Sequence, residues 1–201
     1  MYRIASFIIG YLFGGIQSAI LYGKIKGIDI TEHGSGNPGT TNAVRVLGKR
    51  AGVIVLLIDI LKAILAIAIV RLIFPNEDLL VGLYGGIGAI LGHSYPLFFK
   101  FKGGKGIATT VGTLFAVDYR LAIIAIVLFL VTFGITRIVS ISSLLLTASI
   151  PILLIAFYCG ESYGTEAMLL GFVITGITFY RHKANIKRLI EGTEAKLTSK
   201  K

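Results

Sequence analysis

Residues 52–74 read GVIVLLIDILKAILAIAIVRLIF, a hydrophobic run long enough to cross a membrane as a single helix. A hydrocarbon core of about 30 Å needs about 20 helical residues, since each residue adds about 1.5 Å. Six further apolar runs surround it, at 4–22, 79–99, 106–117, 121–136, 138–158 and 163–180. The pattern predicts an all-α, polytopic membrane helix bundle with about seven transmembrane helices, folded as one domain over residues 1–201.

The composition supports a membrane protein over a soluble one. Hydrophobic residues make up 55% of the chain and charged residues 15%, with a mean hydropathy of +0.84. A soluble domain has about 45–50% apolar and about 25% charged residues. The first run lacks a small-residue cleavage site, so we expect a first span that stays in place. No spacing of Cys and His predicts a metal site, and we expect neither a metal nor a cofactor.

The fourth run, 106–117, is the shortest and would span only about 18 Å as a helix. Two interpretations stay open. The helix extends back through the glycine-rich segment that precedes it, or the run pairs with the fifth run as a re-entrant hairpin. Merging the fourth and fifth runs into one crossing is rejected, because it would export the basic C-terminal tail.

Most of the 20 Lys and Arg residues lie in alternate loops and in the tail, whereas the loops at 75–78 and 160–165 carry acids and no bases. The positive-inside rule therefore predicts an N-terminus outside and a cytoplasmic C-terminus. Part of the net charge of +10 serves anionic membrane lipids. Nucleic acid is not expected as a partner, because the basic residues are divided among loops.

A first polar loop reads HGSGNPGTTNAVR at 33–45. Glycines let the backbone approach a ligand and adopt positive φ, and short polar side chains add donors. A helix starting near Thr41 or Asn42 would bring its N-terminus and a guanidinium toward one anion. The candidate residues of this loop are Gly34, Ser35, Gly36, Asn37, Thr41, Asn42 and Arg45.

A second loop reads FKGGKGIATT at 101–110. Its spacing does not match the P-loop pattern, so ATP hydrolysis is not supported. Glycine amides that open a helix, with a lysine among them, still suit a phosphate group. The candidates here are Gly103, Gly104, Lys105 and Gly106.

Polar residues also lie inside the apolar runs. Asp59 and Lys62 share a helix face three residues apart, and we expect an internal ion pair that braces the site. Ser140 and Ser143 lie just inside the sixth run. They either contact substrate or bond only to neighbouring helices, and the sequence leaves both open.

The tail reads RHKANIKR at 181–188. His182 and Asn185 are three residues apart and would share a helix face at the cytoplasmic surface. A histidine in this place can take a proton near neutral pH or donate to a phosphate.

Together, GSGNPGTTN with Arg45, GGKGIAT at 103–109, Ser140 after Arg137, and RHKANIKRLIEGTE at 181–194 resemble the bacterial acyl-phosphate:glycerol-3-phosphate acyltransferases (PlsY family). The resemblance covers essentially the whole chain. It implies a multi-pass enzyme of the bacterial inner membrane that acylates position 1 of glycerol 3-phosphate and releases lysophosphatidic acid. The donor would be a fatty acyl phosphate, and the active site would face the cytoplasm.

The resemblance also implies roles for particular residues. Ser35 and Arg45 come from the first motif, and the glycerol-phosphate site is expected around Gly103, Gly104, Lys105 and Gly106. The third motif contributes His182 and Asn185, with Glu194 in a structural role.

An acyl phosphate is already activated, so the reaction needs positioning and electrostatic stabilisation rather than a covalent enzyme intermediate. We expect Arg45 and Lys105 to supply counter-charge. Either His182 or the donor's own phosphate takes the proton of the glycerol hydroxyl, and the sequence does not separate the two. A soluble acyl-phosphate synthase is a candidate partner. Two other classes stay open, namely a transporter for an organic phosphate and a non-catalytic membrane scaffold.

Overall fold

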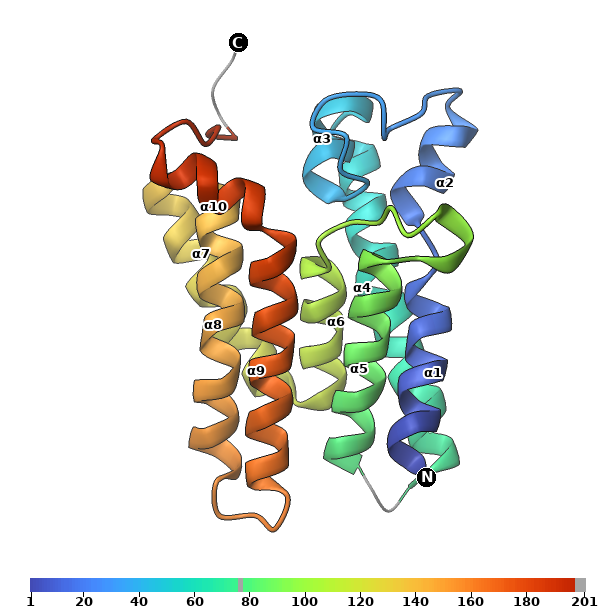
Figure 1. The fold of residues 1–201 in the computed structure, drawn as a ribbon, viewed down its shortest axis with the longest axis vertical. Coiled ribbons are helices and arrows are strands. Elements are labelled where there is room, and N and C mark those ends of the chain that lie inside the picture. The colour runs from blue at the N-terminus through green and yellow to red at the C-terminus, as the bar shows by residue number, and fades with distance from the viewer. Residues whose placement is uncertain (76–77, 198–201) are drawn as a thin grey trace. The chain divides into compact units, whose positions relative to one another are not determined.

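The computed structural model describes residues 1–75 and 78–197, and within these ranges every regular element is a helix (Figure 1). The predicted acidic loop at 75–78 and the end of the basic tail lie partly outside them. The chain divides into two compact units, Met1–Val117 and Asp118–Lys201. We describe each unit separately, and the single acyltransferase domain expected from the sequence stays a prediction.

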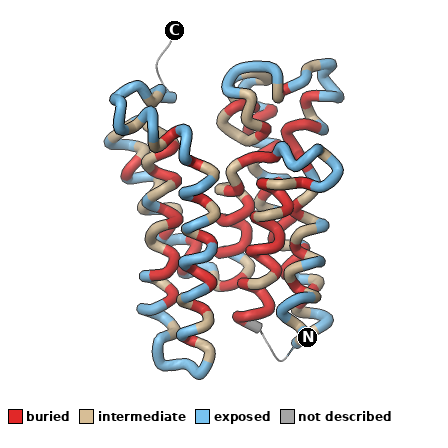
Figure 2. The backbone as a smooth tube through the Cα atoms, in the orientation of Figure 1, coloured by how far each residue is buried: buried red, intermediate tan, exposed pale blue. Residues whose placement is uncertain are grey.

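The first unit is a bundle of longer helices with short helices and loops at one end. In Figure 1, α2, α3 and the loop after α5 gather at the end away from the N-terminus. Figure 2 shows that exposed residues are concentrated in these end loops and buried residues along the inner helices. The helices are α1 (Tyr2–Gly14), α2 (Ser18–Ile25), α3 (Thr40–Leu47), α4 (Lys49–Ile73), α5 (Asp78–Ser94) and α6 (Ile107–Val117), with a 3-10 turn at Leu97–Phe99.

The first apolar run, predicted as one continuous span, is interrupted. The helix stops at Gly14 and restarts at Ser18, so the run forms α1 and α2. A break inside an apolar segment frees backbone groups that neighbouring side chains must satisfy. The Ile16 carbonyl is one such group, and it accepts a hydrogen bond from Lys62 Nζ of α4 at 2.6 Å.

Helices α1 and α5 meet along a seam of small residues. A Cβ at Gly10 would overlap the carbonyl oxygen of Gly85, and one at Gly14 would overlap that of Ala89. On the other side of the seam, a Cβ at Gly92 would overlap the carbonyl oxygen of Tyr11. Small residues that allow backbones to touch are the usual way for helices to associate in lipid.

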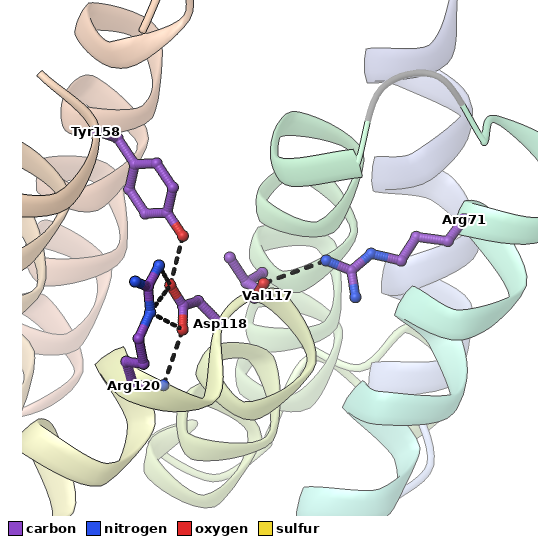
Figure 3. A network of polar contacts seen from close by, with 5 residues as sticks. All are labelled: Arg71, Val117, Asp118, Arg120 and Tyr158. Atoms are coloured by element: carbon purple, nitrogen blue, oxygen red, sulfur yellow. Dashed lines mark hydrogen bonds and ion pairs between the residues drawn. The ribbon is translucent and has the colours of Figure 1, made fainter. Parts of the chain in front are cut away.

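Helix α6 settles one of the two interpretations of the fourth run. It begins at Ile107, after a non-helical segment, so the idea that this helix extends back through the glycine loop is wrong. Gly106 has a φ of 82°, outside the helical range, and this conformation ends the loop. At the other end of α6, the Arg71 guanidinium of α4 donates to the carbonyl of Ala116. It also donates to the carbonyl of Val117 (Figure 3).

The second unit is a three-helix arrangement with a short terminal helix. Pro151 interrupts the hydrogen bonding of α8, because proline has no N–H to donate to the Thr147 carbonyl four residues earlier. Thr175 Oγ1 of α9 donates to that carbonyl at 2.7 Å. The helices are α7 (Tyr119–Thr136), α8 (Val139–Tyr158), α9 (Gly164–Arg181) and α10 (Lys183–Ile190).

Asp118 caps the start of α7. Its carboxylate accepts from the Arg120 backbone N–H at 2.8 Å and forms an ion pair with the Arg120 side chain at 2.7 Å. The Tyr158 hydroxyl of α8 donates to the same carboxylate at 2.5 Å (Figure 3). The hydrogen bonds from Arg120 lower the pKa of Asp118 to about 2.

Four helical stretches of the described residues are long and apolar enough to cross a membrane. The predicted total of about seven crossings and the predicted sidedness stay predictions. The four are Tyr2–Ile25, Lys49–Ile73, Tyr119–Thr136 and Val139–Tyr158.

Candidate active site

The first polar loop is organised by one buried side chain, Asn42 in the first turn of α3. Its Oδ1 accepts the Ser35 N–H at 2.9 Å, and its Nδ2 donates to the carbonyls of Ile30 and His33 at 3.2 and 3.0 Å. Asn42 is 1% exposed. These bonds commit the Asn42 amide to holding the loop, while its predicted contact with substrate stays a prediction.

Two glycines give this loop its shape. Gly34 and Gly36 have φ values of 64° and 68°, in the left-handed region that favours glycine. A Cβ at Gly34 would also overlap Asn42 Oδ1. Between the glycines, Ser35 is exposed. The loop therefore presents the Ser35 hydroxyl on a fixed backbone.

Helix α3 begins at Thr40, close to the expected start, with Gly39 as its N-cap. Thr41 lies in its first turn and is half-buried, and Asn37 lies half-buried in the loop. Arg45 lies in the last turn of α3, and its side chain is exposed. The Arg45 guanidinium is thus exposed on the helix that follows the loop.

The second polar loop lies against the end of α5. The Gly104 N–H donates to the His93 carbonyl at 3.1 Å, and both Gly103 and Gly104 are buried. A Cβ at Gly103 would overlap the His93 carbonyl oxygen, and one at Gly104 would overlap the His93 ring. Only glycine fits at these two positions. Lys105 follows directly and is half-buried.

The two loops of the first unit share a packing surface. Phe99, just before the second loop, packs against an apolar cluster that includes Ile30 and Ala43 from either side of the first loop. Lys24 Nζ lies 5.9 Å from the centre of the Phe99 ring. The structure thus brings the first two motifs to the same end of this unit (Figure 1).

The expected pair of Asp59 and Lys62 forms a buried ion pair in α4, with Nζ and Oδ1 2.8 Å apart. Ser18 Oγ donates to the same Asp59 oxygen at 2.8 Å, and Lys62 Nζ lies 2.8 Å from His93 Nδ1. Sequence reasoning did not find these partners. An interrupted first helix would have pointed to Ser18, but no pattern in the sequence marks the Ile16 carbonyl.

In the second unit, Glu194 gathers three donors from the third motif and α8. Its carboxylate accepts from Ser140 Oγ at 2.8 Å, from Asn185 Nδ2 at 2.5 Å and from Arg188 Nε at 2.6 Å. Burial raises the pKa of Glu194, but the hydrogen bonds from Asn185, Ser140 and Arg188 outweigh it and hold the pKa below its usual range. Sequence reasoning named three of these four residues and missed Arg188.

Ser143, the other predicted serine, donates to the Val139 carbonyl of its own helix at 2.9 Å. The hydroxyl hydrogens of Ser140 and Ser143 are therefore both used within the second unit. Each hydroxyl oxygen can still accept a hydrogen bond, and the predicted substrate contact of both serines stays a prediction.

His182 lies at the junction between α9 and α10, and Asn185 lies within α10. The His182 backbone (φ −97°, ψ 6°) forms the N-cap of α10, so the two residues lie at the start of a new helix, and their predicted shared face stays a prediction. His182 Nδ1 lies 2.8 Å from the Thr178 carbonyl. Because a carbonyl only accepts, Nδ1 carries the hydrogen, and Nε2 of the neutral ring bears the lone pair.

The described residues contain no cluster of three or more His, Cys, Asp or Glu side chains that would hold a metal ion. Bundled apolar helices, with glycine-rich loops whose amides and cations suit phosphate groups, define a helical membrane protein with the features of an enzyme acting on phosphorylated substrates.

Comparison with known proteins supplies the family. Residues 4–192 match the model of a family described as glycerol-3-phosphate acyltransferase, and the chain belongs to that family. It is a membrane glycerol-3-phosphate acyltransferase. It is 40% identical over 192 residues to the glycerol-3-phosphate acyltransferase of Halalkalibacterium halodurans, covering 95% of this chain and 93% of that one. It is 42% identical over 191 residues to the Bacillus subtilis protein of the same name, covering 94% and 95%.

Solved structures agree with this assignment. The chain is similar to the crystal structure of PlsY (YgiH), an integral membrane glycerol 3-phosphate acyltransferase, in its glycerol 3-phosphate form. The TM-score is 0.86 at 36% identity, covering 98% of this chain and 96% of that one. The lysophosphatidic acid form of PlsY matches with a TM-score of 0.85, covering 98% and 95%.

Proposed function

We propose that this protein transfers a fatty acyl group from an acyl phosphate to the 1-hydroxyl of glycerol 3-phosphate, giving lysophosphatidic acid and inorganic phosphate. The observation that carries the proposal is the loop at 33–45. Asn42 holds Gly34 and Gly36 in left-handed conformations there, while Ser35 and Arg45 stay exposed. The glycerol 3-phosphate and lysophosphatidic acid forms of PlsY are consistent with such a substrate and product.

In the proposed reaction, a glycerol hydroxyl oxygen attacks the acyl carbonyl carbon. The carbon–oxygen bond to the phosphate breaks, and the phosphate leaves with the bonding electrons. The hydroxyl proton passes to Nε2 of His182 or to an oxygen of the donor phosphate. Charge develops on the carbonyl oxygen and on the departing phosphate, and cations and backbone amides placed beforehand stabilise it. No covalent enzyme intermediate is required.

The predicted catalytic residues and the glycines of the second loop have a place in this scheme. Arg45 and Lys105 supply counter-charge, and the Ser35 hydroxyl binds one phosphate. The Ser35 and Gly36 amides already donate to Asn42 Oδ1 and to the His33 carbonyl, so they shape the loop. Gly103, Gly104 and Gly106 shape the site for glycerol 3-phosphate. His182 binds phosphate or takes the proton, and Asn185, held by Glu194, orients a substrate. We propose that the reaction takes place at the cytoplasmic face of a bacterial inner membrane, with a soluble acyl-phosphate synthase as candidate supplier of the donor.

The structure weakens the case for a transporter of organic phosphate. That alternative drew support from Asp59 and Lys62, since charges within a membrane often mark a transport pathway. Both are almost fully buried, at 1% and 3% exposure, and are bonded to each other. Lys62 also donates to the Ile16 carbonyl and to His93. All three of its N–H donors are used within the protein, leaving none for a substrate.

The test uses the purified full chain reconstituted in lipid. Palmitoyl phosphate is supplied with and without glycerol 3-phosphate, phosphate release is followed, and the product is identified by mass spectrometry. Lysophosphatidic acid is expected only with both substrates. A parallel reaction offers acyl-CoA, and product from acyl-CoA alone would overturn the proposed donor. No product from folded protein with either donor would overturn the proposed reaction.

A further inference from the structure

We infer that His93 is a positioning residue for the glycine loop at 103–106, acting through both its backbone carbonyl and its ring. The inference rests on the proposed function in one respect, namely that this loop binds glycerol 3-phosphate. His93 lies in the last turn of α5 and is 3% exposed. Around it meet the break between α1 and α2, the ion pair of α4, and the loop itself.

The backbone carbonyl of His93 holds the loop directly. It accepts the Gly104 N–H at 3.1 Å and the Gln17 side-chain amide, also at 3.1 Å. A carbonyl oxygen has two lone pairs, so these two donors fill its capacity. One comes from the helix break and the other from the loop. The His93 carbonyl therefore ties the start of α2 to the glycine loop.

The ring of His93 is the surface against which the loop lies. A side chain at Gly104 would collide with its Nε2 edge, and one at Gly103 would collide with the His93 carbonyl. This close approach means that a change in ring position must move the loop backbone. Lys105, the proposed ligand of phosphate, is the next residue in the chain.

The ring is held in one orientation by Lys62. Lys62 Nζ lies 2.8 Å from His93 Nδ1, and an ammonium group only donates, so Nδ1 accepts and Nε2 carries the hydrogen. The Asp59 carboxylate is farther from the ring, at 3.6 Å, and is itself paired with Lys62 at 2.8 Å. His93 therefore acts by position.

The network does more than fill the core, because its hydrogen bonds are made to backbone atoms of irregular segments. Lys62 reaches the Ile16 carbonyl at the helix break, and the His93 carbonyl reaches the Gly104 amide. Neither the Ile16 carbonyl nor the Gly104 amide belongs to a helix whose own hydrogen bonds would hold it in place. The Tyr11 hydroxyl adds a bond to the Tyr95 carbonyl at 2.7 Å and holds the segment after α5 from the other side.

The test compares His93→Leu with His93→Asn. Leucine removes the acceptor for Lys62 at similar size, whereas the asparagine side-chain oxygen lies near the place of Nδ1 and restores it. In His93→Leu we expect the KM for glycerol 3-phosphate to rise about 10-fold or more, with kcat changed by less than about 3-fold and the KM for acyl phosphate unchanged. In His93→Asn, the KM for glycerol 3-phosphate should return most of the way to the wild-type value.

Two further variants separate positioning from general loss of stability. Gln17→Met removes one bond to the His93 carbonyl without burying a charge, and a smaller rise in the same KM is expected. Leu154→Ala opens a cavity at a fully buried position of α8 and should lower the melting temperature without changing the KM. Equal KM values in His93→Leu and the wild type, or an equal rise in Leu154→Ala, would overturn the inference.

Hydrogen exchange gives a readout that does not depend on activity. Peptides covering 95–106 should exchange faster in His93→Leu than in the wild type, with His93→Asn between them, while peptides from the middle of α5 stay protected. Unchanged exchange at the loop would also overturn the inference. If the wild type makes no lysophosphatidic acid, the proposed function fails, and hydrogen exchange alone still decides the role of His93.

Discussion

Asn185 Nδ2 donates to Glu194 Oε1 at 2.5 Å, so a predicted catalytic amide is oriented by a predicted structural carboxylate. The same oxygen accepts from Ser140, and the other oxygen accepts from Arg188. Glu194 thereby links α8, α10 and the segment that follows α10. Its charge matters as well as its shape, because all three partners donate.

Glu194→Gln is expected to lower kcat/KM by about 10-fold or more, because the new amide group presents donors to partners that are themselves donors. Steady-state kinetics on reconstituted protein measure the effect. Lys187→Gln, at an exposed position of the same helix α10, serves as a control and should leave kcat/KM unchanged. A lower melting temperature with unchanged kcat/KM in Glu194→Gln would assign Glu194 to stability alone.

The same carboxylate predicts a dependence of stability on pH. Its folded-state pKa is lowered from the ordinary glutamate value of 4.5, so its stabilisation is complete above that value and is lost as the pH falls through the folded pKa. The melting-temperature difference between the wild type and Glu194→Gln should therefore be constant near neutral pH and shrink below about pH 4.5. A difference that grows on acidification would contradict the assignment.

Gly104→Ala should abolish most activity, because the added methyl collides with the His93 ring. A displacement of about 1 Å near a reacting centre can cost about 100-fold in rate, and we expect at least that loss in kcat/KM. Gly176→Ala is the matched control, since its Cβ would meet nothing within 4 Å and it lies inside α9. That change should keep full activity and raise stability by up to about 1 kcal/mol.

Arg45→Ala should reduce turnover by about 100-fold or more while the protein stays folded, because the side chain is exposed and stabilises only charge on the substrates. Arg50→Ala removes a neighbouring exposed cation and should keep turnover within about 3-fold. Kinetics and melting temperature are measured together. Near-normal turnover of Arg45→Ala would remove Arg45 from the proposed mechanism.

Thr175→Val should destabilise the second unit by about 1 kcal/mol, because the Thr147 carbonyl that Pro151 leaves free then loses its donor. In a Pro151→Ala background the alanine N–H can bond to that carbonyl, and the cost of Thr175→Val should fall. Unfolding titrations of the four proteins in this double-mutant cycle measure the coupling. Zero coupling would mean that the two effects are independent.

The sequence predicted the long helices well, because apolar runs of membrane length leave few alternatives to a helix in lipid. The run at 52–74 and the helix Lys49–Ile73 nearly coincide. The interruption after Gly14 was missed, since neither Gly15 nor Gln17 stops an apolar run. What permits the break is the distant Lys62, whose bond to the Ile16 carbonyl no local pattern reveals.

For the site, residue types and spacing identified the loops but not what holds them. Asn42 was assigned to substrate, yet the structure shows its amide engaged with the loop backbone. The partners of Glu194 lie on separate elements, and only the fold brings Ser140 to it. Backbone acceptors such as the His93 carbonyl are invisible in a sequence, because every residue carries the same group.

The seam between α1 and α5 also fixes the position of the glycine loop at 103–106 along the helix axes. Because the backbones touch at Gly10 and Gly14, α1 cannot slide along α5, and the position of α1 along the α5 axis is fixed. Gln17 lies less than one helical turn beyond Gly14, so the same contact places its side-chain amide at the His93 carbonyl. A methyl group added at Gly10, deep in the bundle, should therefore displace the glycine loop, which lies several helical turns away.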